Sequence, residues 1–380
     1  MKKALLASAV CVLFAAPGLV CAQAKPAAAA VPTLDKVLEA SGISVSGYID
    51  AGYNYADKNQ QAFTTHVFDV DNNSFALHQF GLTVAKQPKE GFGGLVNVTV
   101  GRDAQIIHSF PETAGAFLGA STFDVTQAYA QYATGPFTII AGKFTTLTGT
   151  EVIASTGNTT TSRSILFGAV PFTHTGVRGT WALSDTLSLI VGVNNGWDQL
   201  TDATRTKTLE LGATWAPIKP LSIAVSGYSG KELVAPLTST AEGSRTLLDA
   251  VVSYQIIDPL SVGLELLSVQ QDNAPLASGG TGKAKYTGEA LYVTYMITPK
   301  MRGVLRAENF DDKDGYKFGV ANNKYKEFTF TFSYLASDSF EGRVEVRQDK
   351  ADKDFFVKYG STTQDSKSMS SLALQALYKF

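Results

Sequence analysis

The sequence predicts an all-β fold: a transmembrane, antiparallel, up-and-down β-barrel of about 16 strands, within a range of 14 to 18 strands. Segments of about ten residues alternate apolar and polar side chains, as strands with one apolar face do. Short and long connections alternate between these segments. After residue 24, no apolar run approaches the ~20 residues that a spanning helix needs. Because lipid admits only helices or closed barrels, a membrane chain of this kind is expected to be a barrel. A soluble, secreted all-β protein is the alternative.

The first residues read as an export signal. Lys2 and Lys3 precede an apolar run over residues 4–16, and Ala22-Gln23-Ala24 has the small-residue pattern of a cleavage site. We therefore expect a signal peptide over residues 1–24, a periplasmic segment over 25–42 and an outer-membrane barrel over 43–380 of a Gram-negative bacterium. A lipoprotein modified at Cys21 is the alternative, which the bulky Val20 disfavours.

Composition excludes several function classes. Both cysteines, Cys11 and Cys21, lie in the predicted signal peptide, so the mature chain would have neither disulfides nor cysteine metal sites. Without that peptide the chain has 30 basic and 34 acidic residues, because Lys2 and Lys3 are lost from the 32 basic residues of the full sequence. So mild a charge balance argues against nucleic acid as a partner. No cofactor or metal is predicted.

The elements follow in order. Residues 33–40 predict a short helix, with Thr33 as a candidate N-cap. The first strand, 43–55, places Val45, Ile49 and Tyr53 on one face and Asp50 on the other. Strands at 76–84 and 92–100 follow, and residues 137–144 are ambiguous, so that Lys143 is either a lumen or a rim residue.

Turn residues divide the rest of the chain. Seven short connections are rich in Pro, Gly, Asp or Ser, as tight turns require: 87–91, 134–136, 184–186, 217–220, 257–259, 298–300 and 337–339. Eight longer polar connections lie between them, for example 57–73, 103–121, 229–243, 270–282 and 350–368. Together they join 16 strands, and an even number puts both chain ends on the periplasmic side.

The chain finishes on an alternating strand. Leu372, Leu374, Ala376 and Tyr378 share its apolar face, and Phe380 is the last residue. This resembles the closing strand of an outer-membrane barrel. The resemblance implies that Tyr378 and Phe380 form an assembly signal, recognised by the barrel-assembly machinery, and that this strand closes against the one beginning near Ile43.

Charged side chains mark the inner face of the later strands. Five alternate charges in one strand cannot face lipid, since a basic residue near the midplane costs roughly 2–4 kcal/mol. The predicted pore-lining residues are Arg178, Glu210, Asp249, Glu265, Arg302, Arg306, Glu308, Glu327, Arg343, Glu345, Arg347 and Asp349, joined by Glu341, Gln127 and Gln131. Such charges can neutralise one another and stiffen the wall, but in a wide barrel we interpret them as facing permeating solutes.

The longest connection, residues 147–171, carries the apolar cluster Ile165-Leu166-Phe167. Exposing that cluster outside would be unfavourable, so we expect the loop to fold inward as a constriction. Its candidate constriction residues are Glu151, Asn158, Thr159 and Arg163. A folded external cap or a partner-contact surface is the alternative.

Several segments resemble the β-barrel porin family described as OmpL-like, and the resemblance spans residues 41–380. They are residues 41–50, Ser-Arg-Ser-Ile-Leu-Phe at 162–167, residues 171–178, Asn-Gly-Trp-Asp at 195–198 and Arg-Ala-Glu-Asn-Phe at 306–310. The resemblance implies an outer-membrane channel without naming a solute. General porins set acidic loop groups against wall arginines. This loop offers only Glu151, which argues against a strong transverse field.

We therefore expect a porin through which small hydrophilic solutes diffuse passively. Outer-membrane lipid and lipopolysaccharide would surround it. A homotrimer is one alternative for its oligomeric state. One alternative is a non-conducting structural or adhesive barrel that presents its loops. Another is a barrel hydrolase, which the lack of a Gly-x-Ser-x-Gly motif and the scatter of His66, His78, His108 and His174 disfavour. A plugged receptor is not expected, since no plug domain precedes the first strand.

Overall fold

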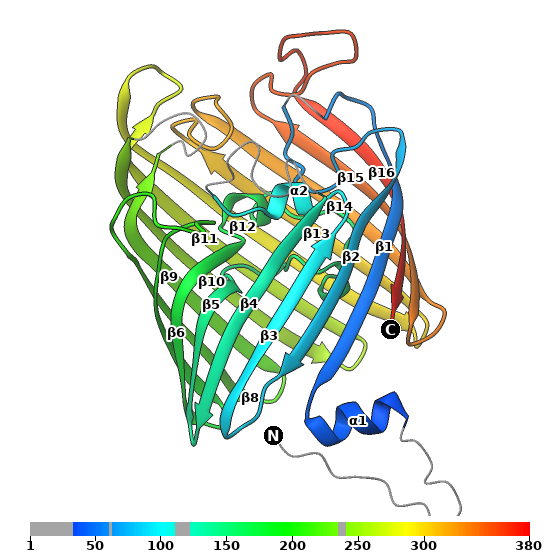
Figure 1. Ribbon diagram of the computed structural model, residues 1–380. Coiled ribbons are helices and arrows are strands. Elements are labelled where there is room, and N and C mark those ends of the chain that lie inside the picture. Colours follow the sequence, from blue (N-terminus) through cyan, green and yellow to red (C-terminus); the bar gives the residue numbers. More distant parts are fainter. Residues whose placement is uncertain (1–32, 61–62, 111–121, 235–240) are drawn as a thin grey trace, which may run out of the picture.

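A computed structural model describes residues 33–60, 63–110, 122–234 and 241–380. Within these residues the chain forms sixteen antiparallel strands that close into one barrel (Figure 1), which confirms the predicted fold. The strands are β1 (Ser44–Ala56), β2 (Ser74–Lys86), β3 (Gly91–Val100), β4 (Phe123–Thr134), β5 (Phe137–Thr145), β6 (Thr173–Ser184), β7 (Leu187–Asn194), β8 (Thr208–Ile218), β9 (Leu221–Leu233), β10 (Glu242–Ile257), β11 (Leu260–Pro275), β12 (Thr281–Thr298), β13 (Met301–Asp312), β14 (Asn323–Leu335), β15 (Phe340–Ala351) and β16 (Ser368–Lys379). The helical segments are α1 (Leu34–Ser41), α2 (Ala104–Ile107), η1 (Ser155–Gly157) and η2 (Phe167–Ala169).

All seven predicted tight turns are confirmed, and they lie together at one end of the barrel, the turn end. The longer connections lie at the other end, the loop end. Two of these are shorter than predicted: β9 and β10 extend the hairpin around residues 229–243, and β11 and β12 extend the one around 270–282. The polar side chains of these segments predicted loops, but strand pairing depends on backbone hydrogen bonds and continues through them.

The last strand closes the barrel as predicted. β16 pairs antiparallel with β1, and beyond it the N–H of Phe380 donates to the carbonyl of Gly47 at 2.9 Å. The N–H of Gly47 donates back to the Phe380 carbonyl, also at 2.9 Å. A Cβ on residue 47 would lie 2.5 Å from the Phe380 ring, so a larger residue there would displace the ring. The ring itself stacks on Phe80.

Deleting Phe380 is expected to lower the yield of folded barrel, because it removes both hydrogen bonds to Gly47 and the ring contact with Phe80. Phe380→Ala is the matched control, since it keeps the backbone bonds and loses only the ring. The measurement is the fraction of heat-modifiable, fast-migrating protein in unboiled gels. A deletion variant that assembles as well as the parent would contradict the role of this residue in closure.

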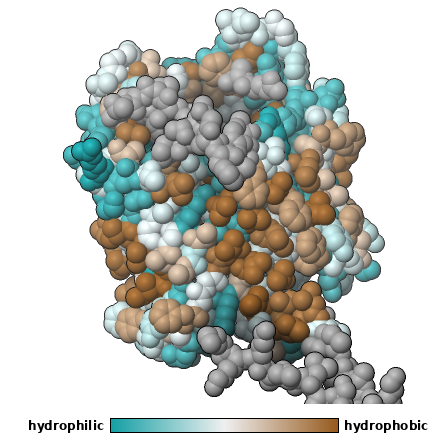
Figure 2. Space-filling model, in the orientation of Figure 1, coloured by the Kyte–Doolittle hydropathy of each residue, from teal (hydrophilic) through white to brown (hydrophobic). Residues whose placement is uncertain are grey.

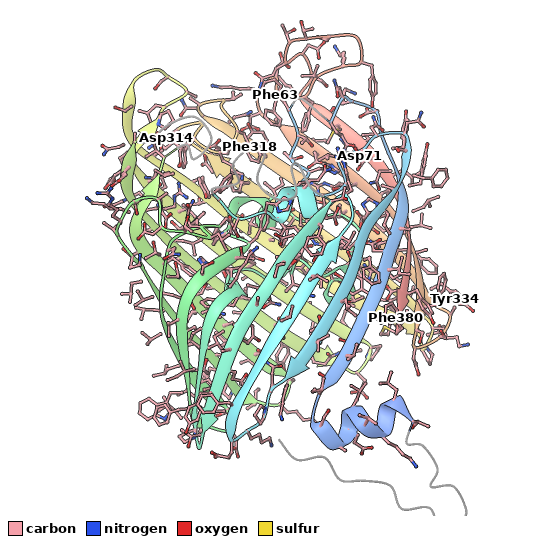
Figure 3. The ribbon with its side chains drawn as sticks, viewed as in Figure 1. Phe63, Asp71, Asp314, Phe318, Tyr334 and Phe380 are labelled. Atoms are coloured by element: carbon pink, nitrogen blue, oxygen red, sulfur yellow. The ribbon has the colours of Figure 1, made fainter. Side chains whose placement is uncertain are left out.

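On the face that Figure 2 shows, hydrophobic residues gather over the middle and lower part of the barrel. On β14, for example, Phe328 and Phe330 are exposed while Glu327 and Thr329 are buried, as the alternation predicted. Exposed aromatic side chains gather near the turn end, where Figure 3 labels Tyr334 and Phe380. Others there are Phe92, Tyr132, Phe137, Trp181, Trp215, Tyr254, Tyr295, Phe340 and Tyr378. An apolar band with an aromatic girdle is typical of a transmembrane barrel.

The predicted N-terminal helix is present as α1, and Gly42 ends it in a left-handed conformation with φ of 67°. Thr33 is the N-cap residue, as predicted, although its side chain makes no capping hydrogen bond. No helix among the described residues is long and apolar enough to cross a bilayer. The predicted signal peptide, residues 1–24, lies outside the described residues.

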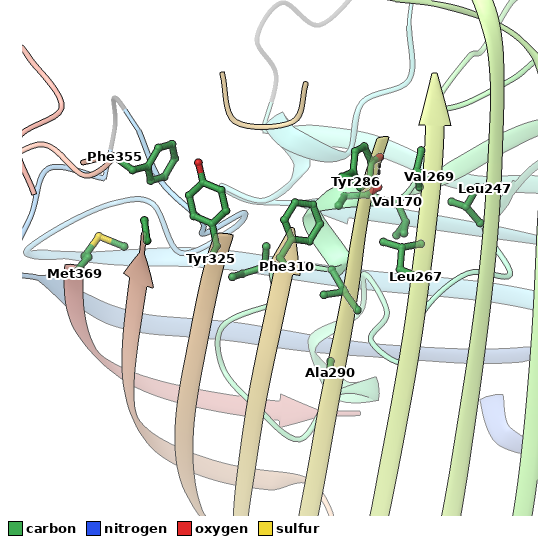
Figure 4. Close-up of a cluster of buried hydrophobic side chains, with 14 of the residues drawn as sticks. Val170, Leu247, Leu267, Val269, Tyr286, Ala290, Phe310, Tyr325, Phe355 and Met369 are labelled. Carbon is green, nitrogen blue, oxygen red and sulfur yellow. Dashed lines mark hydrogen bonds between the residues drawn. The ribbon is translucent and has the colours of Figure 1, made fainter. Parts of the chain in front are cut away.

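A cluster of buried apolar side chains fills the inside of the barrel toward the loop end (Figure 4). Tyr325 on β14 meets Phe355 from the loop after β15 with ring centroids 4.9 Å apart, and Phe310 on β13 contacts Phe318 from the loop before β14. The Tyr286 hydroxyl donates to the Ala169 carbonyl at 2.8 Å. These contacts hold the loops that follow β13 and β15 against the wall.

Candidate functional site

The connection between β5 and β6, here called the inner loop (residues 146–172), folds into the barrel as predicted. Its base is closed where the N–H of Thr146 donates to the Phe172 carbonyl at 3.0 Å. Ile165, Leu166 and Phe167 are buried, so the apolar cluster is covered by the protein rather than exposed outside. The loop reaches from β9, where Thr148 bonds Ser226, to β2, where Gln79 bonds the carbonyl of Ile153.

Carboxylates of the inner wall bind the loop through its backbone N–H groups. Glu345 accepts from Thr161 at 2.6 Å and from Ser162 at 2.9 Å. Glu308 accepts from the N–H groups of Ile165 at 2.9 Å and Leu166 at 3.1 Å. Near the start of the loop, Asp249 and Glu265 accept in the same way from residues 149 and 150.

Arginines of the same wall bind the loop carbonyls. Arg343 donates to the carbonyls of Asn158 at 2.7 Å and Thr160 at 2.9 Å. Arg347 donates to the carbonyl of Arg163 at 2.6 Å. Together with the carboxylates and Arg306, these side chains form what we call the docking ladder: Asp249, Glu265, Arg306, Glu308, Arg343, Glu345 and Arg347. It binds mostly main-chain groups, so it fixes the path of the loop.

Arg306 lies at the centre of the ladder and is fully buried. Its guanidinium meets Glu151 of the loop at 2.6 Å, Glu327 at 3.1 Å and Glu308 at 3.5 Å. Burial alone would raise the pKa of Glu151, but Arg306, Arg163 and the N–H of Ser164 outweigh it and lower the pKa. The one acidic residue of the loop is therefore ionised and neutralised in place.

Two of the four predicted constriction residues are buried and hold the loop together. Arg163 is 1% exposed; it donates to the carbonyls of Val152 and Ile153, and its guanidinium lies 5.3 Å from the ring centre of Phe68. The Asn158 amide bonds both backbone groups of Val152. Arg163 and Asn158 bond backbone groups of the loop because a loop inside the barrel must satisfy its own backbone where the wall offers no partner. Of the four residues, only Thr159 is not buried.

The remaining predicted wall residues all face inward, and most are ion-paired. Arg178 pairs with Glu210 and stacks on Phe144, and Arg302 pairs with Glu341. Asp349 pairs with Arg347 at 2.8 Å, while Gln127 and Gln131 bond neighbouring loop and turn groups. Lys143, ambiguous from the sequence, is buried and lies 3.2 Å from Asp124.

This pairing corrects the expectation that the wall charges meet permeating solutes. Arg306, Glu308, Arg343, Glu345 and Arg347 are each 5% exposed or less. The inner loop covers them, and a buried charge is stable only when partnered. The surface that the loop itself leaves open is uncharged; it includes Thr150, Val152, Thr156, Gly157 and Thr159.

A second attachment was not foreseen. His66, in the connection between β1 and β2, places Nδ1 2.6 Å from Asp69 and Nε2 3.2 Å from Asp349, and Thr65 donates to the other Asp349 oxygen. Burial and Arg347 lower the pKa of His66, but the two carboxylates outweigh them and raise it. His66 and Asp349 are 283 residues apart, and no local pattern in the sequence pairs them.

The other three histidines are also near groups that explain their positions. His78 lies 3.7 Å from Asp103, His108 lies 3.2 Å from Asp124, and the ring of His174 stacks on Tyr228 at 4.6 Å. Within the described ranges, no group of three or more His, Cys, Asp or Glu side chains could hold a metal ion.

Residues 42–380 match the family "Putative beta-barrel porin-2, OmpL-like". The chain belongs to this family. Membership of this family, together with the barrel fold, indicates an outer-membrane channel and an outer-membrane location for the chain. No functionally curated protein matches the sequence.

Solved structures with a similar fold are also outer-membrane proteins. The channel DcaP of Acinetobacter baumannii is 17% identical, with a TM-score of 0.60 over 89% of this OmpL-like chain and 97% of DcaP. An anion-selective porin from Comamonas acidovorans is 11% identical, with a TM-score of 0.60 over 89% and 99% of the two chains. OprB of Pseudomonas putida is 12% identical, with a TM-score of 0.60 over 91% and 96%. At these identities the likeness is one of fold.

Proposed function

We propose that the chain is a porin through which small hydrophilic solutes diffuse passively across the outer membrane. The observation that carries this proposal is the inner loop, which the docking ladder fixes inside a closed barrel of sixteen strands. A loop attached at so many points narrows the lumen to a set width. A barrel whose wall alone had to be stiff would not need a loop across its interior.

The uncharged surface of the loop suggests which solutes pass. Glu151 is neutralised by Arg306, and Arg163 is buried, so the loop presents hydroxyl and small side chains to the lumen. Uncharged solutes and small ions of either sign then meet little electrostatic barrier. We expect weak ion selectivity.

Purified protein in a planar bilayer is expected to give stepwise conductance increments with a reversal potential near zero in a salt gradient of equally mobile ions. Folded barrel that inserts but gives no increments would overturn the porin proposal. Strong selectivity for one ion sign would overturn the neutral constriction alone.

Insertion of folded barrel without conductance would favour a structural or adhesive barrel. A specific observation supports this second candidate: His66 ties the loop after β1 to Asp349 of the nearby strand β15, and the apolar cluster around Phe310 and Phe355 gathers others at the loop end. Such a barrel would present its loops without a continuous water path.

The surroundings of the barrel are part of the proposal. Its apolar band would contact outer-membrane lipid and lipopolysaccharide, and residues 1–24 would direct export and be cleaved. Tyr378 and Phe380, exposed at the turn end, would be recognised by the barrel-assembly machinery. Measuring the size of the protein in detergent would distinguish a homotrimer from a monomer.

A further inference from the structure

A pocket of about 180 Å³ lies between the inner loop and the wall strands β10 to β12. The loop contributes residues 150–151 and 157–160, and the wall contributes Ser253, Ser261, Val262, Gly263, Tyr292 and Thr294. The wall residues lie within six residues of the ends of β10, β11 or β12 near the turn end, so the pocket is on the turn-end side of the loop.

The pocket gathers hydroxyl groups that the protein leaves unused. Some hydroxyls of the loop are paired: Thr148 bonds Ser226, and Thr160 donates to Glu151. Those of Thr150 and Thr161 are buried without a hydrogen-bond partner, and of these two only Thr150 lines the pocket. Among the residues that the structure describes, none of five pocket hydroxyls has a hydrogen-bond partner: those of Thr150, Thr159, Ser253, Ser261 and Thr294.

The acidic groups at this pocket are engaged by the protein. Glu151 is the one charged residue of the lining, and its two carboxylate oxygens are held by Arg306, Thr160 and the N–H of Ser164. Glu265 lies behind the lining, where it accepts from the N–H of Thr150 and from the Tyr292 hydroxyl. An ion entering the pocket would lose hydration without gaining a counter-charge. A solute hydroxyl would gain partners, because each serine or threonine hydroxyl both donates and accepts.

We propose that this pocket is a binding subsite for a small uncharged polyhydroxylated solute, such as a single sugar ring or a short polyol. The inference rests on the proposed function, which brings solutes past the loop. The pocket of about 180 Å³ has room for several water molecules, which is the scale of a single sugar ring.

The test uses ion current through the purified, full-length barrel in a planar bilayer. Conductance in salt alone tests the proposed function separately. D-glucose is then added, and the excess current noise is recorded against concentration. Gluconate and glucosamine serve as charged probes of similar size. We expect saturable excess noise with glucose and none with the two charged probes at the same concentrations.

The double variant Ser261→Ala/Thr294→Val removes two free hydroxyls with little change in shape. It is expected to raise the half-saturating glucose concentration by roughly tenfold, about what two lost hydrogen bonds imply. Thr180→Val is the matched control, because Thr180 is inward-facing on β6 and lies outside the pocket. It should leave the glucose curve unchanged.

Conductance without saturable glucose noise would overturn the subsite and leave the proposed function standing. Saturable noise that the double variant does not alter, or that Thr180→Val alters equally, would also overturn it. Equal binding of gluconate would refute the uncharged class of solute.

Discussion

Replacing Arg306 with methionine is expected to destabilise the folded barrel by about 3–5 kcal/mol, the usual effect of removing one partner from a buried ion pair. Methionine fills similar space but leaves Glu151, Glu308 and Glu327 facing one another without a counter-charge. The measurement is urea-induced unfolding in detergent or lipid, followed by tryptophan fluorescence and by gel mobility.

Arg302→Met is the matched control. Arg302 lies on the same strand and the same face, but its side chain is partly exposed and it pairs with Glu341 alone. Its loss should be less destabilising, because Glu341 keeps a second ion pair with Arg343 at 2.6 Å. Adding Glu151→Gln to Arg306→Met should recover part of the lost stability, since it removes one of the unpaired carboxylates. Equal effects at residues 302 and 306 would contradict the central role given to Arg306.

Reversing Arg343 and Arg347 to glutamate is expected to release the middle of the inner loop and to raise conductance and the solute size limit. Each arginine donates to loop carbonyls, at 2.6–2.9 Å, and a carboxylate in its place would repel those oxygens. From the sequence alone, the same reversal would be expected to raise cation preference. The structure predicts that a shift in the reversal potential is secondary to loop release.

Single-channel recording separates these two outcomes, because it gives conductance and reversal potential from the same barrel. Arg343→Lys/Arg347→Lys is the control; it keeps the charge but lacks the planar guanidinium fork that holds the loop carbonyls. We expect noisier current with unchanged selectivity from the lysine pair. A shifted reversal potential at unchanged conductance in the glutamate variant would show that these charges face the solute stream.

Much of the fold follows from patterns that are local in the chain. Alternation on β14 and β15 places Phe328 outward and Glu345 inward, since the side chains of a strand point to opposite sides in turn. The tight turns follow from the same stretches of Pro, Gly, Asp and Ser. The limits of the hairpins around residues 229–243 and 270–282 were missed, because polar composition does not mark where pairing stops.

The site was foreseen only in outline. The apolar triplet at 165–167 predicted that the loop folds inward, because water cannot stably surround it. The sequence offers no equivalent signal for what Arg163 binds, and its charge suggested a lumen role. Its observed partners are carbonyls of its own loop and two aromatic rings.

The sequence by itself determined the barrel, the inward face of the predicted wall charges and the inward fold of the loop. Each depends on how one short segment divides its side chains between water, lipid and protein. The tertiary structure alone decided that the charges bind the loop: Glu345 meets Ser162 across 183 residues of chain, and His66 meets Asp349 across 283. A charge in a strand must be partnered once it is buried, and only the path of the whole chain supplies the partner.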